Sequence, residues 1–247
     1  MASERIGKQA ADHLRDAFGQ AAPDHFRWQT EGAFVSQRER DLVRAAFLPL
    51  GERVLDVGCG EGATLVHLGE PAGATGIDLF EDKIAFARTR LPKCRFVVGS
   101  ALALPFDAGA FDHVIVRDVI HHLEDPAPFV DEARRVLAPG GRLDVLEPCG
   151  RNPLIALHAL TQPAERGELR STMAYLRALV GRRFRVTETA RHQPMPIHRI
   201  VFHPTLGRPA LGEHALARGL VDLAARAAER LVPRAAWAYL HVRAVVE

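Results

Sequence analysis

The stretch VLDVGCGEG, residues 54–62, decides how this chain folds. Three apolar residues, Val54, Leu55 and Val57, surround Asp56, and three glycines then follow at every second position. The apolar run predicts a buried strand, and the glycines predict a tight turn in which a ligand can approach the backbone closely. The stretch therefore predicts a strand that runs into the kind of turn that receives nucleotide-like ligands.

Strands and helices alternate on the C-terminal side of this stretch. Strands are predicted at 53–58, 74–79, 94–101, 111–118 and 142–148, with helices at 62–69, 81–91 and 126–137. This alternation indicates an α/β fold in which a parallel sheet has helices on both faces and ligands bind at the carboxyl ends of the strands.

The flanking segments complete the predicted order of elements. Helices are predicted at 3–20, 36–48, 171–181 and 212–232, strands at 184–190 and 235–247, and a loop with two aromatic residues at 23–32. The segments 152–168 and 191–211 lie between these elements, and the second contains no clear element, yet it is too apolar to predict disorder.

Composition excludes several classes of function. The chain has 247 residues, of which 47% are hydrophobic and 25% charged, and its net charge of +2 gives no case for a nucleic-acid partner. Charge runs such as QRERDLVR, residues 37–44, are typical of solvated helix faces. The three cysteines, Cys59, Cys94 and Cys149, lie too far apart to suggest a zinc site or a disulfide framework.

No apolar run approaches the roughly 20 residues that a membrane span needs. The first 20 residues also lack the apolar core of a secretory signal. A cytoplasmic protein without a membrane span is therefore expected, and its oligomeric state stays open.

Two classes of ligand compete for the glycine turn. A dinucleotide site carries GxGxxG, whereas Gly58, Gly60 and Gly62 are spaced GxGxG, and the GK[ST] of a P-loop does not follow. Asp56 stands directly before the glycines, where its carboxylate would repel a pyrophosphate and attract an ammonium or sulfonium group. Spacing and charge together favour a ligand that carries a positive charge.

Five motifs in the same order resemble those of the class I S-adenosylmethionine-dependent methyltransferases. They are VLDVGCGEG at 54–62, GIDL at 76–79, GSALALPFDAGAFDHVIV at 99–116, RDVIHHLEDP at 117–126 and EARRVLAPGGRLDVLEP at 132–148. The small-molecule subgroup that includes ubiquinone and menaquinone methyltransferases has the most similar motifs. The resemblance implies a Rossmann-like, doubly wound, mostly parallel seven-stranded sheet with an antiparallel C-terminal strand and helical cap elements.

The resemblance also implies three parts of the chain. Residues 1–50 are expected to form a helical lid, and 51–147 the core that binds S-adenosyl-L-methionine and leaves S-adenosyl-L-homocysteine. Residues 148–247 are expected to complete the sheet and to insert cap elements at about 148–170 and 191–232, which form the acceptor pocket.

The residues that would bind the cofactor follow from the same motifs. They are Asp56, Gly58, Cys59, Gly60, Asp78, Leu79, Ser100, Ala101, Arg117 and His122. In the family, the acid at the position of Asp78 takes both ribose hydroxyls, since one carboxylate can accept two hydrogen bonds from a diol. Leu79 would pack on the adenine, and Asp56 would orient the turn. The backbone carbonyl of Arg117 would hold the methionine ammonium while its side chain pairs with Asp118.

Ser100 departs from the family pattern, which has an aspartate in this segment. The aspartate accepts a hydrogen bond from the adenine amino group, and a serine is shorter and neutral. We therefore expect a weaker or water-mediated contact, with backbone groups around Ser100 and Ala101 still reading the adenine edge.

Catalysis is expected to be an in-line SN2 transfer for which the protein mainly aligns the two reactants. An alcohol acceptor needs a base, and His121 and His122 are the candidates in the core. Candidates in the C-terminal segments are His158, His192, His198 and His203. No metal is expected, because Asp118 lacks carboxylate partners for a Mg²⁺ site.

The acceptor is expected to be a small, partly apolar metabolite, natural-product-like or quinone-like, that is methylated at oxygen. The apolar residues that would line its pocket are Leu154, Ile155, Leu157, Leu160, Met195, Ile197 and Phe202. The same residues would equally serve as the core of the cap. Transfer to nitrogen or carbon, and a cofactor-binding protein without transfer activity, remain alternatives.

Overall fold

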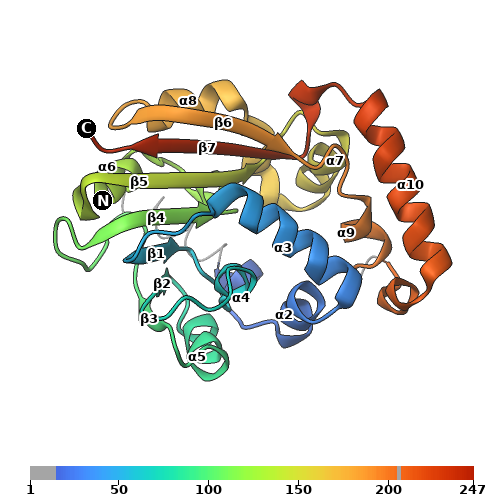
Figure 1. Cartoon of the computed structure of the whole chain (residues 1–247), viewed down its shortest axis with the longest axis horizontal. Coiled ribbons are helices and arrows are strands. Elements are labelled where there is room, and N and C mark those ends of the chain that lie inside the picture. Colours follow the sequence, from blue (N-terminus) through green and yellow to red (C-terminus); the bar gives the residue numbers. More distant parts are fainter. Residues whose placement is uncertain (1–14, 205–206) are drawn as a thin grey trace.

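A seven-stranded sheet forms the centre of the structure, a computed structural model that describes residues 15–204 and 207–247 (Figure 1). The strands are β1 Val54–Val57, β2 Thr75–Asp78, β3 Arg95–Val98, β4 Phe111–Arg117, β5 Leu137–Pro148, β6 Arg185–His192 and β7 Tyr239–Val245. Their order is β3-β2-β1-β4-β5-β7-β6, and β7 runs antiparallel to β5 and β6 while the other pairs are parallel. The predicted Rossmann-like sheet with an antiparallel C-terminal strand is confirmed.

Helices cover both faces of the sheet because successive side chains of a strand point to opposite sides. The covering helices are α3 Ala33–Phe47, α4 Ala63–His67, α5 Glu81–Arg90, α6 Ala127–Val136 and α8 Met173–Val180. Leu55 and Val57 of β1 belong to the core that includes α6 and α8. Val54 belongs to the opposite core, which includes α3, α4 and α5.

Helix α2, Pro23–Thr30, occupies the segment predicted as a loop, so that prediction is wrong. Pro23 at the start and Asp24 in the first turn are typical of a helix N-terminus, and these two residues could have predicted the helix. The predicted helix at 3–20 lies mostly outside the described residues, although 15–18 are helical. Helix α3 begins at Ala33 rather than at residue 36.

The C-terminal part supplies several short helices and one long helix, α10. They are α7 Pro153–Thr161, η2 Pro163–Arg170, α9 Ile197–Val201, η3 Pro209–Glu213, α10 Ala215–Leu231 and η4 Arg234–Ala236. In Figure 1, α10 stands to the right of the sheet, with α9 beside it. No helix among the described residues is long and apolar enough to cross a bilayer.

A buried cluster of charged residues attaches the carboxyl end of α3 to the sheet. Asp144 of β5 is fully buried and accepts hydrogen bonds from Arg243 Nε at 2.8 Å and from Arg142 Nε at 3.1 Å. His113 and His241 also lie within 2.9 Å and 2.8 Å of its carboxylate oxygens. The two arginines in turn donate to carbonyl oxygens at the end of α3, among them Ala46 O at 2.8 Å and Phe47 O at 3.2 Å. Asp144 therefore holds the cations that fix α3.

Candidate functional site

A cavity of about 1280 Å³ lies over the carboxyl ends of β1, β2 and β4. The glycine turn, Asp78 and the residues that follow β4 form its floor. Helix α2, α7 and α9 contribute to its walls through residues such as Trp28, Leu154 and Arg199. Elements from the N-terminal, central and C-terminal parts of the sequence thus enclose one space.

The glycine turn has the backbone conformation that the motif predicts. Gly58 and Gly60 have φ angles of +71° and +52°, in the left-handed region that favours glycine. The N–H groups of Gly58 and Cys59 both donate to Ile77 O, at 2.8 and 3.0 Å, which anchors the turn to β2. A Cβ built on Gly60 would meet no atom within 4 Å, so the backbone there faces open space in the cavity.

Asp56 lies beneath this turn and does not line the cavity. Its side chain is fully buried, and its Oδ2 has no hydrogen-bond partner among the described residues. Burial raises the pKa of Asp56 to about 7, and Arg117 counteracts the rise while Asp78 adds to it. An unpartnered buried carboxylate next to the cavity fits a ligand that brings a positive charge.

Asp78 at the end of β2 connects the turn to the next helix. Its Oδ2 accepts a hydrogen bond from Gly60 N at 2.9 Å, and its Oδ1 accepts one from Phe80 N at 3.0 Å at the start of α5. Each oxygen keeps a lone pair for a further donor. Leu79 follows with 44% of its surface exposed and lines the same cavity.

Ser100 and Ala101 lie on the cavity wall after β3. The Ser100 hydroxyl oxygen accepts a hydrogen bond from Leu102 N at 3.1 Å, and this contact stabilises the turn that follows β3. The structure thus brings together the cofactor-binding residues predicted from the sequence: apart from Asp56, all of them line the cavity.

Arg117 belongs to a buried network that the sequence did not predict. Its Nη2 lies 2.5 Å from Glu39 Oε2 and its Nε lies 3.3 Å from Asp118 Oδ2, which is the predicted neighbour. Glu39 also accepts hydrogen bonds from Arg199 of α9, from Nε at 2.8 Å and from Nη2 at 2.5 Å. His198 Nε2 lies 3.4 Å from the same carboxylate.

Glu39 is the centre of this network and is fully buried, so the interpretation of QRERDLVR as a solvated face is wrong at this position. Burial alone would raise the pKa of Glu39, but Arg199, His198 and Arg117 hold it well below its ordinary value. Its position on α3 with apolar neighbours at Leu42 and Val43 was the available signal.

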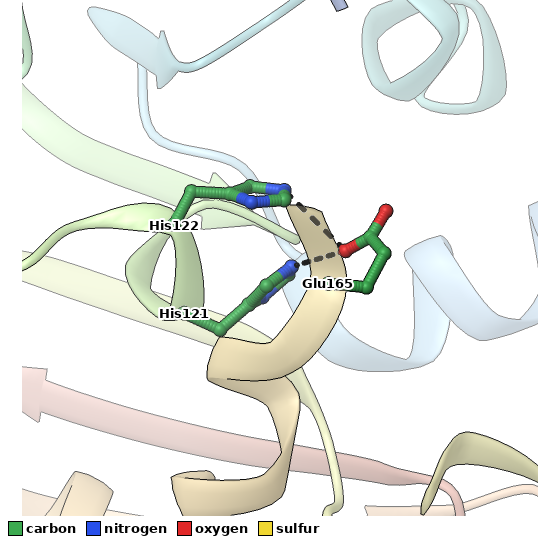
Figure 2. A group of neighbouring side chains, drawn as sticks. All are labelled: His121, His122 and Glu165. Carbon is green, nitrogen blue, oxygen red and sulfur yellow. Dashed lines mark hydrogen bonds and ion pairs between the residues drawn. The ribbon is translucent and has the colours of Figure 1, made fainter. Parts of the chain in front are cut away.

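His121 and His122 form η1, Ile120–His122, directly after β4, and their rings lie 3.9 Å apart. His121 Nδ1 lies 2.7 Å from Glu147 Oε2, and its Nε2 lies 3.1 Å from Glu165 Oε2. His122 Nε2 is 3.7 Å from the same Glu165 oxygen. Figure 2 shows both imidazoles turned toward that carboxylate, which belongs to η2.

The two histidines differ in charge. Burial alone would lower the pKa of His121, yet Glu147 and Glu165 hold it well above its ordinary value, which favours the charged form of this ring. Burial and the neighbouring His121 lower the pKa of His122 to about 4, which leaves it neutral. The sequence missed Glu165 because it lies in a segment without recognisable periodicity.

The predicted acceptor pocket divides into two groups of residues. Leu154, Ile155 and Leu157 of α7 line the cavity, and Ile200 of α9 joins them. Phe202 instead packs at 5.5 Å from the Phe34 ring in a small separate core, with Ile197 against the same cluster. Leu160 and Met195 also lie outside the lining. Phe202 and Ile197 therefore build the cap rather than the pocket, and Leu160 is exposed on the surface.

Of the other candidate histidines, two line the cavity and two lie outside it. His158 lines the cavity and lies 3.3 Å from Glu168, and His203 lines it beside Trp28, with ring centres 5.0 Å apart. His198 is buried in the Glu39 network, and His192 belongs to β6 away from the lining.

Comparison with known proteins identifies the central part of the chain. Residues 55–145 match the family described as "Methyltransferase domain". A 27-O-demethylrifamycin SV methyltransferase of Amycolatopsis mediterranei is 32% identical over 54% of this chain and 53% of its own length. A demethylmenaquinone methyltransferase of Lactococcus lactis is 29% identical over 59% of this chain and 62% of its own length. The chain spans about half the length of the curated relatives it matches, and as little as 30% in one case.

A solved structure from Thermotoga maritima agrees with the fold over nearly the whole chain. It is described as an S-adenosylmethionine-dependent methyltransferase and possible histamine N-methyltransferase, and it superposes with a TM-score of 0.64. The two share 20% sequence identity, and the match covers 95% of this chain and 99% of that one. At this identity the likeness shows the fold.

Proposed function

We propose that this chain, whose residues 55–145 match the methyltransferase-domain family, is a class I S-adenosylmethionine-dependent methyltransferase that transfers a methyl group from S-adenosyl-L-methionine to a small, partly apolar metabolite at oxygen. The observation that carries the proposal is the single cavity that joins the glycine turn to the apolar residues of α7. One end offers the backbone and carboxylate groups for a nucleoside, and the other offers an apolar wall for an acceptor.

Each group at the cofactor end of the cavity has its own role in binding S-adenosyl-L-methionine. When bound, S-adenosyl-L-methionine supplies a methyl group activated by its sulfonium. Asp78 uses its remaining lone pairs to accept from the two ribose hydroxyls, and Leu79 packs on the adenine. Gly58, Cys59 and Gly60 bring the backbone close to the ligand. Asp56 acts from below the turn, where its charge attracts the cationic part of the ligand.

The remaining contacts complete the cofactor site. Ser100 and Ala101 border the adenine, and the backbone carbonyl of Arg117 accepts from the methionine ammonium. His122 lies beside the reacting methyl group. Within residues 1–50, helix α2 and the segment 17–22 before it act as a lid, whereas α3 packs on the sheet. The elements at 148–170 and 191–232 act as the cap over the acceptor.

The acceptor's oxygen must lose a proton when it attacks, and the cavity offers two different histidines for this. His122 is neutral, so its ring can accept a hydrogen bond from the acceptor, although a pKa of about 4 makes it a weak base. His121 is charged and paired on both sides, so it serves as a positioning residue that holds Glu165 and His122 in place.

Calorimetric titration with S-adenosyl-L-methionine, followed by incubation with a labelled methyl donor and panels of phenols, carboxylates, amines and carbon nucleophiles, tests the proposal. We expect binding and transfer to a phenol or alcohol. Absence of binding at millimolar ligand would overturn the proposal. Binding with transfer to nitrogen or carbon, or with no transfer at all, would replace it by the corresponding alternative.

A further inference from the structure

Three side chains at the edge of the cavity are arranged as ligands for a metal ion. One donor atom each from His121, His122 and Glu165 lies within 4.8 Å of the other two (Figure 2). We propose that these residues bind a divalent transition-metal ion, with Zn²⁺ as the reference ion.

The two distances from Glu165 to the histidines are close to those of a tetrahedral site. Bonds of about 2.0–2.1 Å to imidazole nitrogen or carboxylate oxygen place neighbouring ligand atoms about 3.3 Å apart. Glu165 Oε2 lies 3.1 Å from His121 Nε2 and 3.7 Å from His122 Nε2, on either side of this value. Two imidazoles and one carboxylate favour Zn²⁺ and related ions over Mg²⁺ or Ca²⁺, which prefer oxygen ligands.

A buried carboxylate orients the first imidazole. Glu147 Oε2 lies 2.7 Å from His121 Nδ1, so this nitrogen carries a proton and Nε2 is directed toward the group. Glu147 is held by the N–H groups of Val119 and Ile120, at 2.7 and 2.9 Å from its Oε1. A histidine that donates to a carboxylate with one nitrogen and ligates with the other is the usual second-shell arrangement of metal sites.

The third ligand is also held in place. Gly167 of η2 packs so closely on η1 that a Cβ would lie 1.8 Å from His121 O, and Arg170 donates to the carbonyl of Leu123. These contacts fix η2, and with it Glu165, against the histidines.

The charge around the group favours a cation. Among the described residues, Glu147 and Glu165 form ion pairs with histidines only, and no lysine or arginine neutralises either carboxylate. Metal binding at His121 Nε2 would release the proton that this nitrogen carries in the metal-free protein. A divalent ion with two neutral imidazoles would then balance the two carboxylates.

The open side of the site faces the cavity, since all three ligands line it. This part of the inference rests on the proposed function. With the ion bound, His122 Nε2 serves as a ligand, and the ion rather than this nitrogen acts on the acceptor: a hydroxyl bound in the free coordination position would lose its proton to solvent more easily. Its oxygen would then form the new O–C bond as the S–C bond breaks, and the sulfonium would become the neutral thioether of S-adenosyl-L-homocysteine.

Metal binding is measured on the full chain without a polyhistidine tag, after treatment with a chelator and without methyl donor or acceptor. Zn²⁺ is titrated against a chromophoric chelator, and Co²⁺ is added separately to record its visible ligand-field bands. We expect one ion per chain and the bands of a four- or five-coordinate site. Absence of stoichiometric binding would overturn the proposal, whatever the protein does to methyl donors.

Two variants and one matched control locate the ion. His122→Gln and Glu165→Gln lie at the cavity surface and should each weaken Zn²⁺ binding by about ten-fold or more. Glu168→Gln alters a carboxylate of the same η2 that pairs with His158, and it should leave the affinity unchanged. Equal weakening by all three variants, or by none, would contradict the assignment. Circular dichroism and thermal melting identify any variant that fails to fold.

Discussion

The carboxylate of Asp78 accepts a hydrogen bond from the backbone N–H of Gly60 at 2.9 Å. This contact joins the end of β2 to the glycine turn after β1, two segments that lie side by side in the sheet. Asp78, which is expected to bind the ribose hydroxyls, thus also stabilises the conformation of the neighbouring glycine turn. A change at Asp78 therefore acts on two parts of the cofactor site at once.

Asp78→Ala should weaken the binding of S-adenosyl-L-methionine by about 1–3 kcal/mol, because charged hydrogen bonds to a diol are lost. Calorimetry measures the effect. Asp82→Ala, at an exposed position on α5, is the matched control and should bind as the unmodified protein does. Unchanged affinity in a folded Asp78→Ala protein would reject the ribose role.

Ser100→Asp restores the acid that the family has in this segment, and it should hold or improve the affinity for S-adenosyl-L-methionine. The longer, charged side chain can accept from the adenine amino group, which the Ser100 hydroxyl reaches less well. Calorimetric titration with S-adenosyl-L-methionine measures the affinity of this variant. A large loss of affinity would mean that this segment does not face the adenine.

Glu39→Ala should lower the free energy of unfolding by about 3–5 kcal/mol, because it leaves the buried cations Arg117 and Arg199 without their shared carboxylate. Urea denaturation measures the change. Asp41→Ala on the same helix is exposed and should change stability little. A loss of the same size in both variants would show that the network is not the cause.

Asp56→Asn should stabilise the ligand-free protein at pH 8. The pKa of Asp56 is about 7 in the folded protein against an ordinary value of 3.8, so folding favours the protonated form. Stability from this group is therefore complete below about pH 4 and is lost as the pH rises to about 7. Asparagine is neutral throughout.

The gain in the free energy of unfolding at pH 8 should be on the order of 1–4 kcal/mol, and it should shrink toward pH 4. Urea denaturation of both proteins across this range checks it. A difference that does not vary with pH would contradict the raised pKa.

The sheet could be predicted because its signal is local. Apolar runs such as Val54–Val57, bounded by glycine turns, mark buried strands whatever the rest of the chain does. The cofactor residues could be predicted for the same reason, since Asp78 and Ser100 lie at the ends of such strands.

The partners of those residues could not be predicted, because they are set by tertiary contacts. Glu39 and Arg117 are 78 positions apart, and His121 and Glu165 are 44 apart. Nothing in the composition around Glu165 marks it, and Glu39 stands within a charge run of ordinary appearance. Helix α2 was missed for a different reason, since the helix start signal at Pro23 and Asp24 was not recognised.

The Glu39 network also limits how such a protein can be recombined. A chimera that keeps residues 1–148 and takes the remainder from a relative would replace Arg199 and His198 with foreign side chains. Glu39 would then face Arg117 alone, and the new cap would lack its ionic attachment to α3. A chimera built to change the acceptor specificity should therefore keep Arg199. Otherwise it should take α3 from the same relative that supplies the cap.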